Sequence, residues 1–463
     1  MGDKALVLKA AAQILENQTP PLDQETLIAF VARFLDSRDI YLDLCRRHGS
    51  PLYILEEDVL VERARRFAAA FRRSLPDVRF FYAMKSNNLT ELAEILTHHG
   101  FGLDVSSGEE LTQAVGLGAR DIIFSGPGKT IGELELAVRQ HERVTVLIDS
   151  FGELERLAYV AARANVRVRA GVRLTTEEHG LWRKFGIPLL DLPRFLMTAE
   201  THAHVILKGL QFHTSWNMNP DAQTAFIARL GGILAGLDKP ARSRIGFIDI
   251  GGGYWPPQGE WLQSAGTPEG KLRQYVSPDI YASSDEHYCV PSTPIEPFAR
   301  QITAAINDHI FPHVRCAVYF EPGRWICHDA MHLLLTVVDK KSADLVITDG
   351  GTNAIGWERF ETDYFPVINL THPGKDEIAC LVLGSLCTPH DVWGYGYFGS
   401  AIEPGDVLLI PTQGAYTYSL RQNFIKPLPK VVVRKAAQKD AAGRDDRTDA
   451  GRHDVGARRA NEE

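Results

Sequence analysis

The 463-residue chain lacks the features that mark several large classes of protein. No run approaches the ~18 consecutive apolar residues of a membrane-spanning helix, and a net charge of −8 gives no basic surface for nucleic acid or anionic lipid. The six cysteines show no CxxC spacing, which argues against a zinc site and against a disulfide scaffold. The first residues resemble neither a secretory nor a myristoylation signal. We expect a cytoplasmic protein without metal, nucleic-acid or membrane partners.

The chain has an ordinary globular composition and a length that favours two domains. Residues 1–45 are predicted to form a helical extension, and 46–77 a strand and a helix that partly join a later β-domain. Over 78–310 short apolar strands alternate with helix-length segments, which predicts an α/β (β/α)8 barrel of the TIM type. Strands without helices between them predict an all-β domain over 311–434. The polar tail, 435–463, is expected to be disordered.

Polar side chains gather at the predicted carboxyl ends of the barrel strands, where a parallel barrel builds its active site. They are Lys85, Asp104, Arg173, His213, Gly251–Gly253, Glu321 and Arg324. Each alone could be a solvated charge, a structural histidine or a tight turn, but their convergence predicts one shared site. In FIDIGGGY the three glycines allow backbone N–H groups to approach an anion, and their spacing is not that of a nucleotide-binding loop. With Arg324 they favour a phosphate.

Six segments in order give a more specific indication: FYAMKSN, GLDVSSGEEL, KFGI, FIDIGGGY, FEPGRW and GAYTYS. Together they resemble the fold-type III pyridoxal-phosphate-dependent decarboxylases, the group of ornithine and diaminopimelate decarboxylases, which share their barrel with alanine racemase. The resemblance runs from about residue 50 to about residue 425. It implies a carboxy-lyase that binds pyridoxal 5′-phosphate and acts on an amino acid. It also implies a homodimer with shared active sites.

The resemblance assigns catalytic roles to four residues. Lys85 matches the lysine that forms a Schiff base with the cofactor, and we expect desolvation and positive neighbours to lower its pKa. Glu321 matches the carboxylate on the pyridine nitrogen, which keeps the ring an electron sink. His213 matches the imidazole that stacks on the ring. Cys387, in GSLCTPHD, matches a cysteine that reaches the other subunit's site and returns a proton after carbon dioxide leaves.

Further matches concern the hold on the cofactor. The phosphate contacts implied are Gly251, Gly252, Gly253, Gly323, Arg324 and Tyr416. The family pattern HxGS reads HTSW here, so Ser215 is expected to replace the usual serine unless Trp216 crowds that position. Asp104, Glu110 and Arg173 match residues that orient the lysine and the cofactor. Arg169 is the alternative to Arg173.

The residues for the far end of the substrate depart from the family. Thr388 follows the cysteine, where ornithine enzymes have aspartate and diaminopimelate enzymes have glutamate. A buried distal ammonium would lose its partner, so neither ornithine nor diaminopimelate is expected. Arg359 and Tyr364 predict an anionic or polar far end, and Arg324 and Asp391 complete the predicted substrate contacts.

A long loop at 256–292 and the N-terminal extension lie outside the common pattern. They suit an unusual substrate, such as an intermediate of natural-product or siderophore synthesis. Two alternatives stay open on the sequence alone. One is an amino-acid racemase or epimerase on the same scaffold. The other is a non-catalytic homologue that binds partners, although Lys85, Glu321 and Cys387 are all present.

Overall fold

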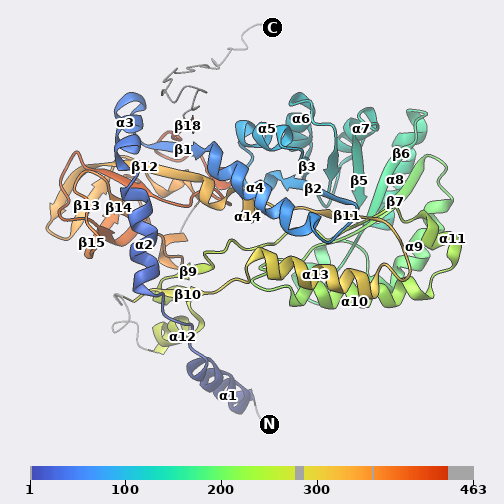
Figure 1. Ribbon diagram of the computed structural model, residues 1–463, viewed down its shortest axis with the longest axis horizontal. Helices are drawn as coiled ribbons and strands as arrows, with labels where there is room; N and C mark the ends of the chain where they lie inside the picture. The colour runs from blue at the N-terminus through green and yellow to red at the C-terminus, as the bar shows by residue number, and fades with distance from the viewer. Residues whose placement is uncertain (1–2, 277–285, 357–358, 436–463) are drawn as a thin grey trace, which may run out of the picture.

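The computed structural model describes residues 3–276, 286–356 and 359–435 and shows a barrel beside a β-domain (Figure 1). Eight parallel strands close the barrel in the order β11-β2-β3-β4-β5-β6-β7-β8. They are β2 (Val78–Ala83), β3 (Gly102–Val105), β4 (Ile122–Phe124), β5 (Val144–Ile148), β6 (Val168–Leu174), β7 (Val205–Phe212), β8 (Phe247–Asp249) and β11 (Ala317–Phe320). The predicted barrel, β-domain and helical extension are confirmed.

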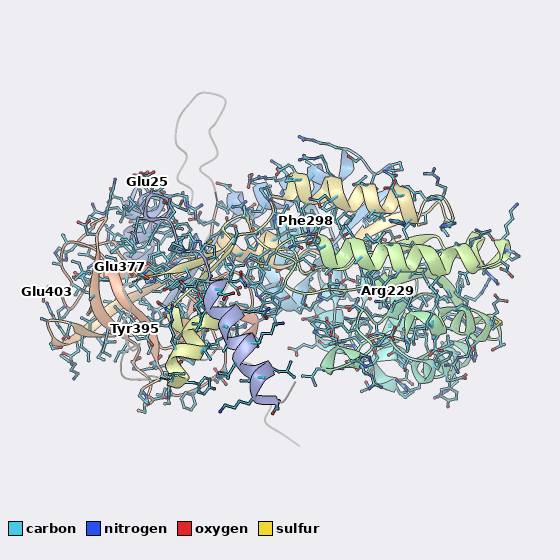
Figure 2. All side chains as sticks on the ribbon, turned by 90° about the horizontal axis from the view of Figure 1, so that it is seen from below. Glu25, Arg229, Phe298, Glu377, Tyr395 and Glu403 are labelled. Atoms are coloured by element: carbon cyan, nitrogen blue, oxygen red, sulfur yellow. The ribbon has the colours of Figure 1, made fainter. Side chains whose placement is uncertain are left out.

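Amphipathic helices cover the barrel. In α8 the buried residues Leu154, Leu157 and Ala161 recur at helical spacing and face the strands. The barrel helices are α4 (Glu57–Arg72), α5 (Thr90–His98), α6 (Gly108–Gly116), α7 (Ile131–Arg139), α8 (Phe151–Arg163), α9 (Leu192–Glu200), α10 (Asp221–Gly236), α11 (Lys239–Arg244), α13 (Ile295–His309) and the short α14 (Arg324–Cys327). Figure 2 shows α10 and α13 side by side, with Phe298 on α13.

The inside of the barrel has an apolar floor and a polar layer above it. Phe81, Ile123, Leu147, Phe247 and Ala317 form a separate buried cluster in the barrel interior. Because side chains two apart in a strand share a face, the next inward positions toward the carboxyl ends are polar on three strands, at Ser125, Asp149 and Asp249, and Glu321 follows Tyr319 on β11. The same alternation that fills the floor therefore places ionisable groups at the mouth.

The β-domain is one sheet in the order β13-β15-β16-β14-β17-β12-β1-β18. Its strands are β1 (Leu52–Glu56), β12 (Met331–Ser342), β13 (Leu345–Thr348), β14 (Ile368–Asn369), β15 (Glu377–Leu383), β16 (Val392–Phe398), β17 (Val407–Ile410) and β18 (Lys430–Arg434). Strand β1 lies antiparallel to β12 and parallel to β18, so a segment that precedes the barrel in the chain joins this sheet.

One predicted boundary is wrong. The sequence predicts the β-domain over 311–434, but β11 pairs with β2 and β8 and closes the barrel. The helix that follows β11 has only the four residues of α14. The βα alternation therefore stops in the sequence one strand before the barrel is complete, which made the last strand look like the first of the next domain.

The extension contains α1 (Asp3–Glu16), α2 (Gln24–Leu35) and α3 (Arg38–His48). Leu27, Val31 and Phe34 of α2 are buried in one cluster with Leu334 and Leu409 of the β-domain, whereas α1 buries no residue and projects away (Figure 1). The long loop folds as β9 (Glu260–Leu262), α12 (Pro268–Val276) and β10 (Tyr288–Val290), with β9 and β10 antiparallel. Apart from residue 435, the predicted tail lies outside the described residues. Within the described ranges, no helix combines the length and apolarity needed to cross a membrane.

Candidate active site

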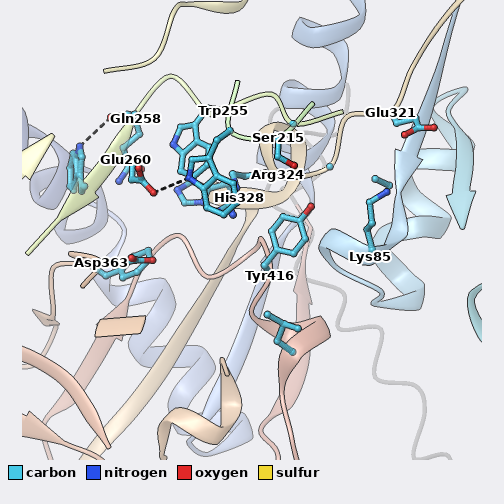
Figure 3. A pocket seen from close by; sticks show the side chains of 18 of the residues that line it. Lys85, Ser215, Trp255, Gln258, Glu260, Glu321, Arg324, His328, Asp363 and Tyr416 are labelled. Atoms are coloured by element: carbon cyan, nitrogen blue, oxygen red, sulfur yellow. Dashed lines mark hydrogen bonds between the residues drawn. The ribbon is translucent and has the colours of Figure 1, made fainter. Parts of the chain in front are cut away.

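A cavity of about 490 Å³ opens at the carboxyl end of the barrel, where the barrel meets the β-domain (Figure 3). Many residues singled out in the sequence line its inner end: Lys85, His213, Ser215, Gly253, Glu321, Gly323, Arg324 and Tyr416. Asp104, Arg173, Gly251 and Gly252 are buried close by. The structure thus brings together residues that lie more than 300 positions apart in the chain.

The turn after β2 presents Lys85 to this cavity. Ser86 Oγ donates to the carbonyl of Ala83 at 2.7 Å, and Asn87 Nδ2 donates to the carbonyl of Gly414 at 2.9 Å. In return the Tyr416 N–H donates to the carbonyl of Ser86 at 2.7 Å. The small polar residues around the lysine therefore tie its turn to the β-domain segment that carries Tyr416.

Lys85 is held as an ammonium ion. Its Nζ donates to Asp104 Oδ2 at 2.6 Å, and the hydroxyl of Ser125 donates to the other oxygen of Asp104. Burial lowers the pKa of Lys85, but the carboxylates of Asp104 and Glu321 raise it by more, so the net shift is upward. Our expectation of a lowered pKa is therefore wrong, because the nearest charges are negative.

Glu110 takes no direct part in this ion pair. Its Oε2 accepts the Ser106 N–H at 2.7 Å and so shapes the turn after β3. Burial raises the pKa of Glu110. Of the two candidate arginines, Arg173 is buried, with Nη1 3.4 Å from the carbonyl of Ser125 and its guanidinium over the Phe185 ring. Arg169 is exposed and binds the carbonyl of Glu142, so it lies away from the site.

A second carboxyl group accompanies Glu321. Asp249, at the end of β8, is fully buried, and Glu321 is 2 % exposed. Burial, with the negative charges of Asp104 and Asp249, raises the pKa of Glu321 well above its ordinary value. Burial likewise raises the pKa of Asp249 to about 7. Sequence reasoning missed Asp249, although a lone aspartate inside the apolar run GFIDIGGG was a usable signal.

The backbone N–H groups of the glycine run also form hydrogen bonds to side chains of the site. Gly252 N–H donates to His213 Nδ1 at 3.1 Å, which puts the proton of the neutral ring on Nε2, 3.3 Å from Ser215 Oγ. Burial and the positive charges of Lys85 and Arg173 lower the pKa of His213 well below its ordinary value. Gly251 N–H donates to Asp249 Oδ1 at 2.9 Å. Two of the three N–H groups predicted for the phosphate are thus engaged, and Gly253 lines the cavity.

These residues fit pyridoxal phosphate. A Cβ atom on Gly252 would lie 2.4 Å from the carbonyl oxygen of Glu321, so only glycine allows this close approach. The Arg324 guanidinium lies 4.3 Å from the Trp255 ring centre and 4.9 Å from that of Tyr416, beside the glycines. A primary amine, a buried carboxyl group and a cationic cradle correspond to the cofactor's aldehyde, ring nitrogen and phosphate.

The cavity continues outward into a space that we call the outer chamber, lined by Trp216, Trp255, Gln258, Glu260, Trp261 and Asp363 (Figure 3). Trp216 Nε1 donates to Glu260 Oε1 at 3.3 Å. The hairpin of β9 and β10 forms one wall, and it is fixed to the β-domain by the Tyr364 N–H, which donates to the carbonyl of Trp261 at 2.9 Å. Sequence analysis singled out this long loop, but it did not identify the loop residues Gln258, Glu260 and Trp261 that line the chamber.

Three predicted substrate residues, and the predicted proton donor Cys387, are placed less directly. Tyr364 lines the chamber, yet its hydroxyl donates to Glu377 Oε1 at 3.1 Å. Cys387 is exposed and, like Thr388, is absent from the lining of this chain's own cavity. Both oxygens of Asp391 accept backbone N–H groups, from Thr352 and Leu386, so Asp391 shapes the Cys387 loop. The side chain of Arg359 lies outside what the structure describes.

Comparison with known proteins agrees with this geometry. The family model for the pyridoxal-dependent decarboxylase pyridoxal-binding domain matches residues 60–328. The chain is 25% identical to the L-glutamyl-[BtrI acyl-carrier protein] decarboxylase of Niallia circulans, over 81% of this chain and 86% of that protein. It is 26% identical to the diaminopimelate decarboxylase of Methanothermobacter thermautotrophicus, over 85% and 89%.

Solved structures share the fold. The diaminopimelate decarboxylase of M. jannaschii in complex with L-lysine has a TM-score of 0.72 at 22% identity, covering 86% of this chain and 89% of that one. The family model covers more than half of the chain and ends just past the barrel. The matched range therefore includes the glycine run, Glu321 and Arg324 of the site. The chain therefore belongs to the pyridoxal-dependent decarboxylases.

Proposed function

We propose that this pyridoxal-phosphate-dependent decarboxylase acts on an amino acid whose far end reaches into the outer chamber and is polar but uncharged. The supporting observation is that one cavity joins Lys85 and Glu321 at its inner end to Trp216 and Trp261 at its outer end. Aromatic walls of this kind favour an extended apolar or amide-bearing arm. Glu260 and Asp363, also in the lining, disfavour a free carboxylate there.

Thr388 and one of the relatives support this substrate class. Thr388 is neutral where ornithine and diaminopimelate enzymes have a carboxylate, and Glu260 in the chamber already accepts the Trp216 N–H, which argues against a distal ammonium. One relative is named as acting on a glutamyl group carried by an acyl-carrier protein. We propose a substrate of comparable chemistry, with the amino acid joined through an amide or thioester to a longer arm, as in natural-product assembly.

The residues divide the work at the inner end. Bound pyridoxal phosphate supplies an electron sink for the electron pair left when the carboxylate departs as carbon dioxide. Asp104 Oδ2, 2.6 Å from Lys85 Nζ, would orient the lysine, which must lose its proton before it holds the cofactor covalently. Glu321 would hold the ring nitrogen, and neutral His213 would pack on the ring without adding charge. Ser215, Gly253, Arg324 and Tyr416 would hold the phosphate.

We also propose a cytoplasmic homodimer in which Cys387 serves the partner's site. Cys387 is exposed and outside the lining of its own chain's cavity, so it is available to another subunit. As the proton donor to the substrate carbon, it would finish the reaction. All six cysteines are free thiols, which suits a reducing compartment.

The decisive experiment combines cofactor capture with gas release. Purified protein is loaded with pyridoxal phosphate and reduced with borohydride, and peptide mass spectrometry is expected to find the cofactor on Lys85. Carbon dioxide release is then measured for a panel of free amino acids and their amide- or thioester-extended derivatives, with extended derivatives expected to be preferred. Inversion of the α-centre without gas would indicate a racemase. A chain that captures no cofactor would be a binding protein.

Mixed dimers test the shared site. Cys387→Ala is expected to keep cofactor binding and lose most turnover, while Lys85→Ala loses both. When the two inactive variants are unfolded and refolded together, about a quarter of wild-type activity should return, since half the dimers are mixed and each has one intact site. Refolded Cys387→Ala alone is the control. No recovery, with mixed dimers shown by mass, would place Cys387 outside the partner's site.

A further inference from the structure

Two carboxyl groups lie together at the bottom of the site. Strands β8 and β11 are neighbours, with Asp249 opposite Tyr319, and the Glu321 N–H donates to the carbonyl of Gly251 at 2.9 Å. In this register Asp249 points inward beside Tyr319, and Glu321 follows one inward position farther toward the carboxyl end of the neighbouring strand. Asp249 is 0% exposed and Glu321 2%. Both therefore lie in the polar layer above the apolar floor.

The amines of this layer are paired elsewhere. Lys85 Nζ is 2.6 Å from Asp104, and Lys129 Nζ is 2.7 Å from Glu153. Positive charge reaches Glu321 from Lys85 and Arg173 at longer range, while Asp104 adds negative charge. Asp249 Oδ1 accepts the Gly251 N–H, but in the described part of the chain its Oδ2 finds no N–H or hydroxyl donor. The side chain of Asp249 is within hydrogen-bonding reach of the carboxyl group of Glu321.

Two buried carboxylates in contact cannot both carry charge, so such a pair keeps one proton between its oxygens. The proton supplies the donor that Oδ2 otherwise lacks. Other groups around the pair do not supply it. Gln211, opposite Asp249 on β7, has its amide nitrogen 3.5 Å from Glu321 Oε1. Tyr254 and Tyr319 lie near Asp249, but in the described residues neither hydroxyl is a hydrogen-bond partner of Oδ2.

We infer that Asp249 is a positioning residue that carries this proton and donates it in a hydrogen bond to Glu321. The bond fixes one oxygen of Glu321 and leaves the pair with a single negative charge facing the cofactor's ring nitrogen. One negative charge matches one pyridinium. Two would bury an excess charge, and none would leave the ring nitrogen without a partner.

The inference is tested first on the chain without cofactor. A carboxyl group with a raised pKa keeps its proton in the folded state after the unfolded chain has lost it, so folding stability falls as pH rises through that interval. Asp249→Asn removes the titration and keeps both hydrogen bonds, through Oδ1 from Gly251 and Nδ2 to Glu321. The melting temperature of Asp249→Asn relative to wild type should therefore increase from about pH 5 to about pH 8.

The matched control is Asp149→Asn, the same change in the same layer beside Lys129. Its melting temperature relative to wild type should not show this rise between the two pH values. If the difference between Asp249→Asn and wild type is equally flat, the shared proton does not exist and the inference is wrong. Because this readout needs no turnover, the proposed decarboxylation can fail or succeed independently of it.

Cofactor affinity shows whether Asp249 positions Glu321 or only stabilises the fold. Asp249→Asn should bind pyridoxal phosphate within a few-fold of wild type, because the amide still donates to Glu321. Asp249→Ala should bind it at least tenfold more weakly, with the loss confined to the cofactor and not to the fold. Equal weakening by Asn and Ala, in variants that melt like wild type, would show that the hydrogen bond to Glu321 has no role.

Discussion

Asp104 sets the protonation of Lys85, and its replacement by asparagine should expose this control. Asp104 is fully buried, and its Oδ2 is 2.6 Å from Lys85 Nζ. Asparagine keeps the shape and the hydrogen bond but removes the charge. Burial, which lowers the pKa of Lys85, then acts against fewer opposing charges. The lysine should lose its proton at a lower pH in Asp104→Asn than in wild type.

The size of the shift follows from the distance. At 2.6 Å, Coulomb's law with an effective dielectric constant of about 20 gives about 6 kcal/mol. The Lys85 side chain is 34% exposed, and solvent screening reduces this to about 2–3 kcal/mol. That corresponds to about two pKa units, or about a 100-fold larger fraction of neutral amine at a pH where both forms of the enzyme are mostly protonated.

The assay is the pH dependence of cofactor capture. The rate of pyridoxal-phosphate capture by the apoprotein is followed by absorbance, and the rising limb of its pH profile should move to lower pH by about two units in Asp104→Asn. The pH at which the rate rises depends on the pKa of Lys85, whereas the maximal rate also depends on the geometry of the site. Ser125→Ala is the control, because it removes a hydrogen bond to Asp104 but keeps the charge. Superimposable profiles for Asp104→Asn and wild type would refute the reasoning.

Three further predictions concern the surroundings of the site. Lys129→Met should reduce the free energy of unfolding by about 3–5 kcal/mol, because Glu153 is left buried and unpaired, and adding Glu153→Leu should recover most of it in urea denaturation. Gly252→Ala should abolish cofactor binding measured by absorbance, since the new Cβ would meet the carbonyl of Glu321 at 2.4 Å; binding at wild-type affinity would contradict the cradle. Trp216→Gly should unfold at an equal or higher urea concentration, because Trp216 has φ of 52° and glycine adopts that conformation freely. The same variant should have a higher KM for extended substrates, because Trp216 lines the outer chamber. An unchanged KM would show that the outer chamber does not bind the substrate.

The barrel could be predicted from the sequence because its signal is local. Each strand and helix carries its own periodicity, and Lys85, Asp104 and Arg173 stand at strand ends that can be found by counting. The exception, β11, shows the limit of this reasoning. Its membership in the barrel depends on pairing with β2, the first strand, and nothing local in residues 317–320 reports that partner.

The outer chamber could not be assembled from the sequence for a similar reason. Trp216 follows β7, Glu260 lies in β9, and Asp363 belongs to the β-domain. They meet only because an isolated bridge between Leu262 and Asp363 joins the long loop to the β-domain. The loop's length indicated function, but its register against a segment one hundred residues later decides which side chains face the cavity.

The protonation states of the site residues were the property least predictable from the sequence, and Lys85 shows why. The resemblance implies that Lys85 needs to become a neutral amine, and from this we expect positive neighbours. The polar layer instead surrounds it with Asp104 and Glu321. The negative charges of Asp104 and Glu321 keep Lys85 as an ammonium ion. The same charges would stabilise the protonated ring nitrogen of bound pyridoxal phosphate. The environment of Lys85 therefore suits the site with its cofactor bound better than it suits the lysine alone.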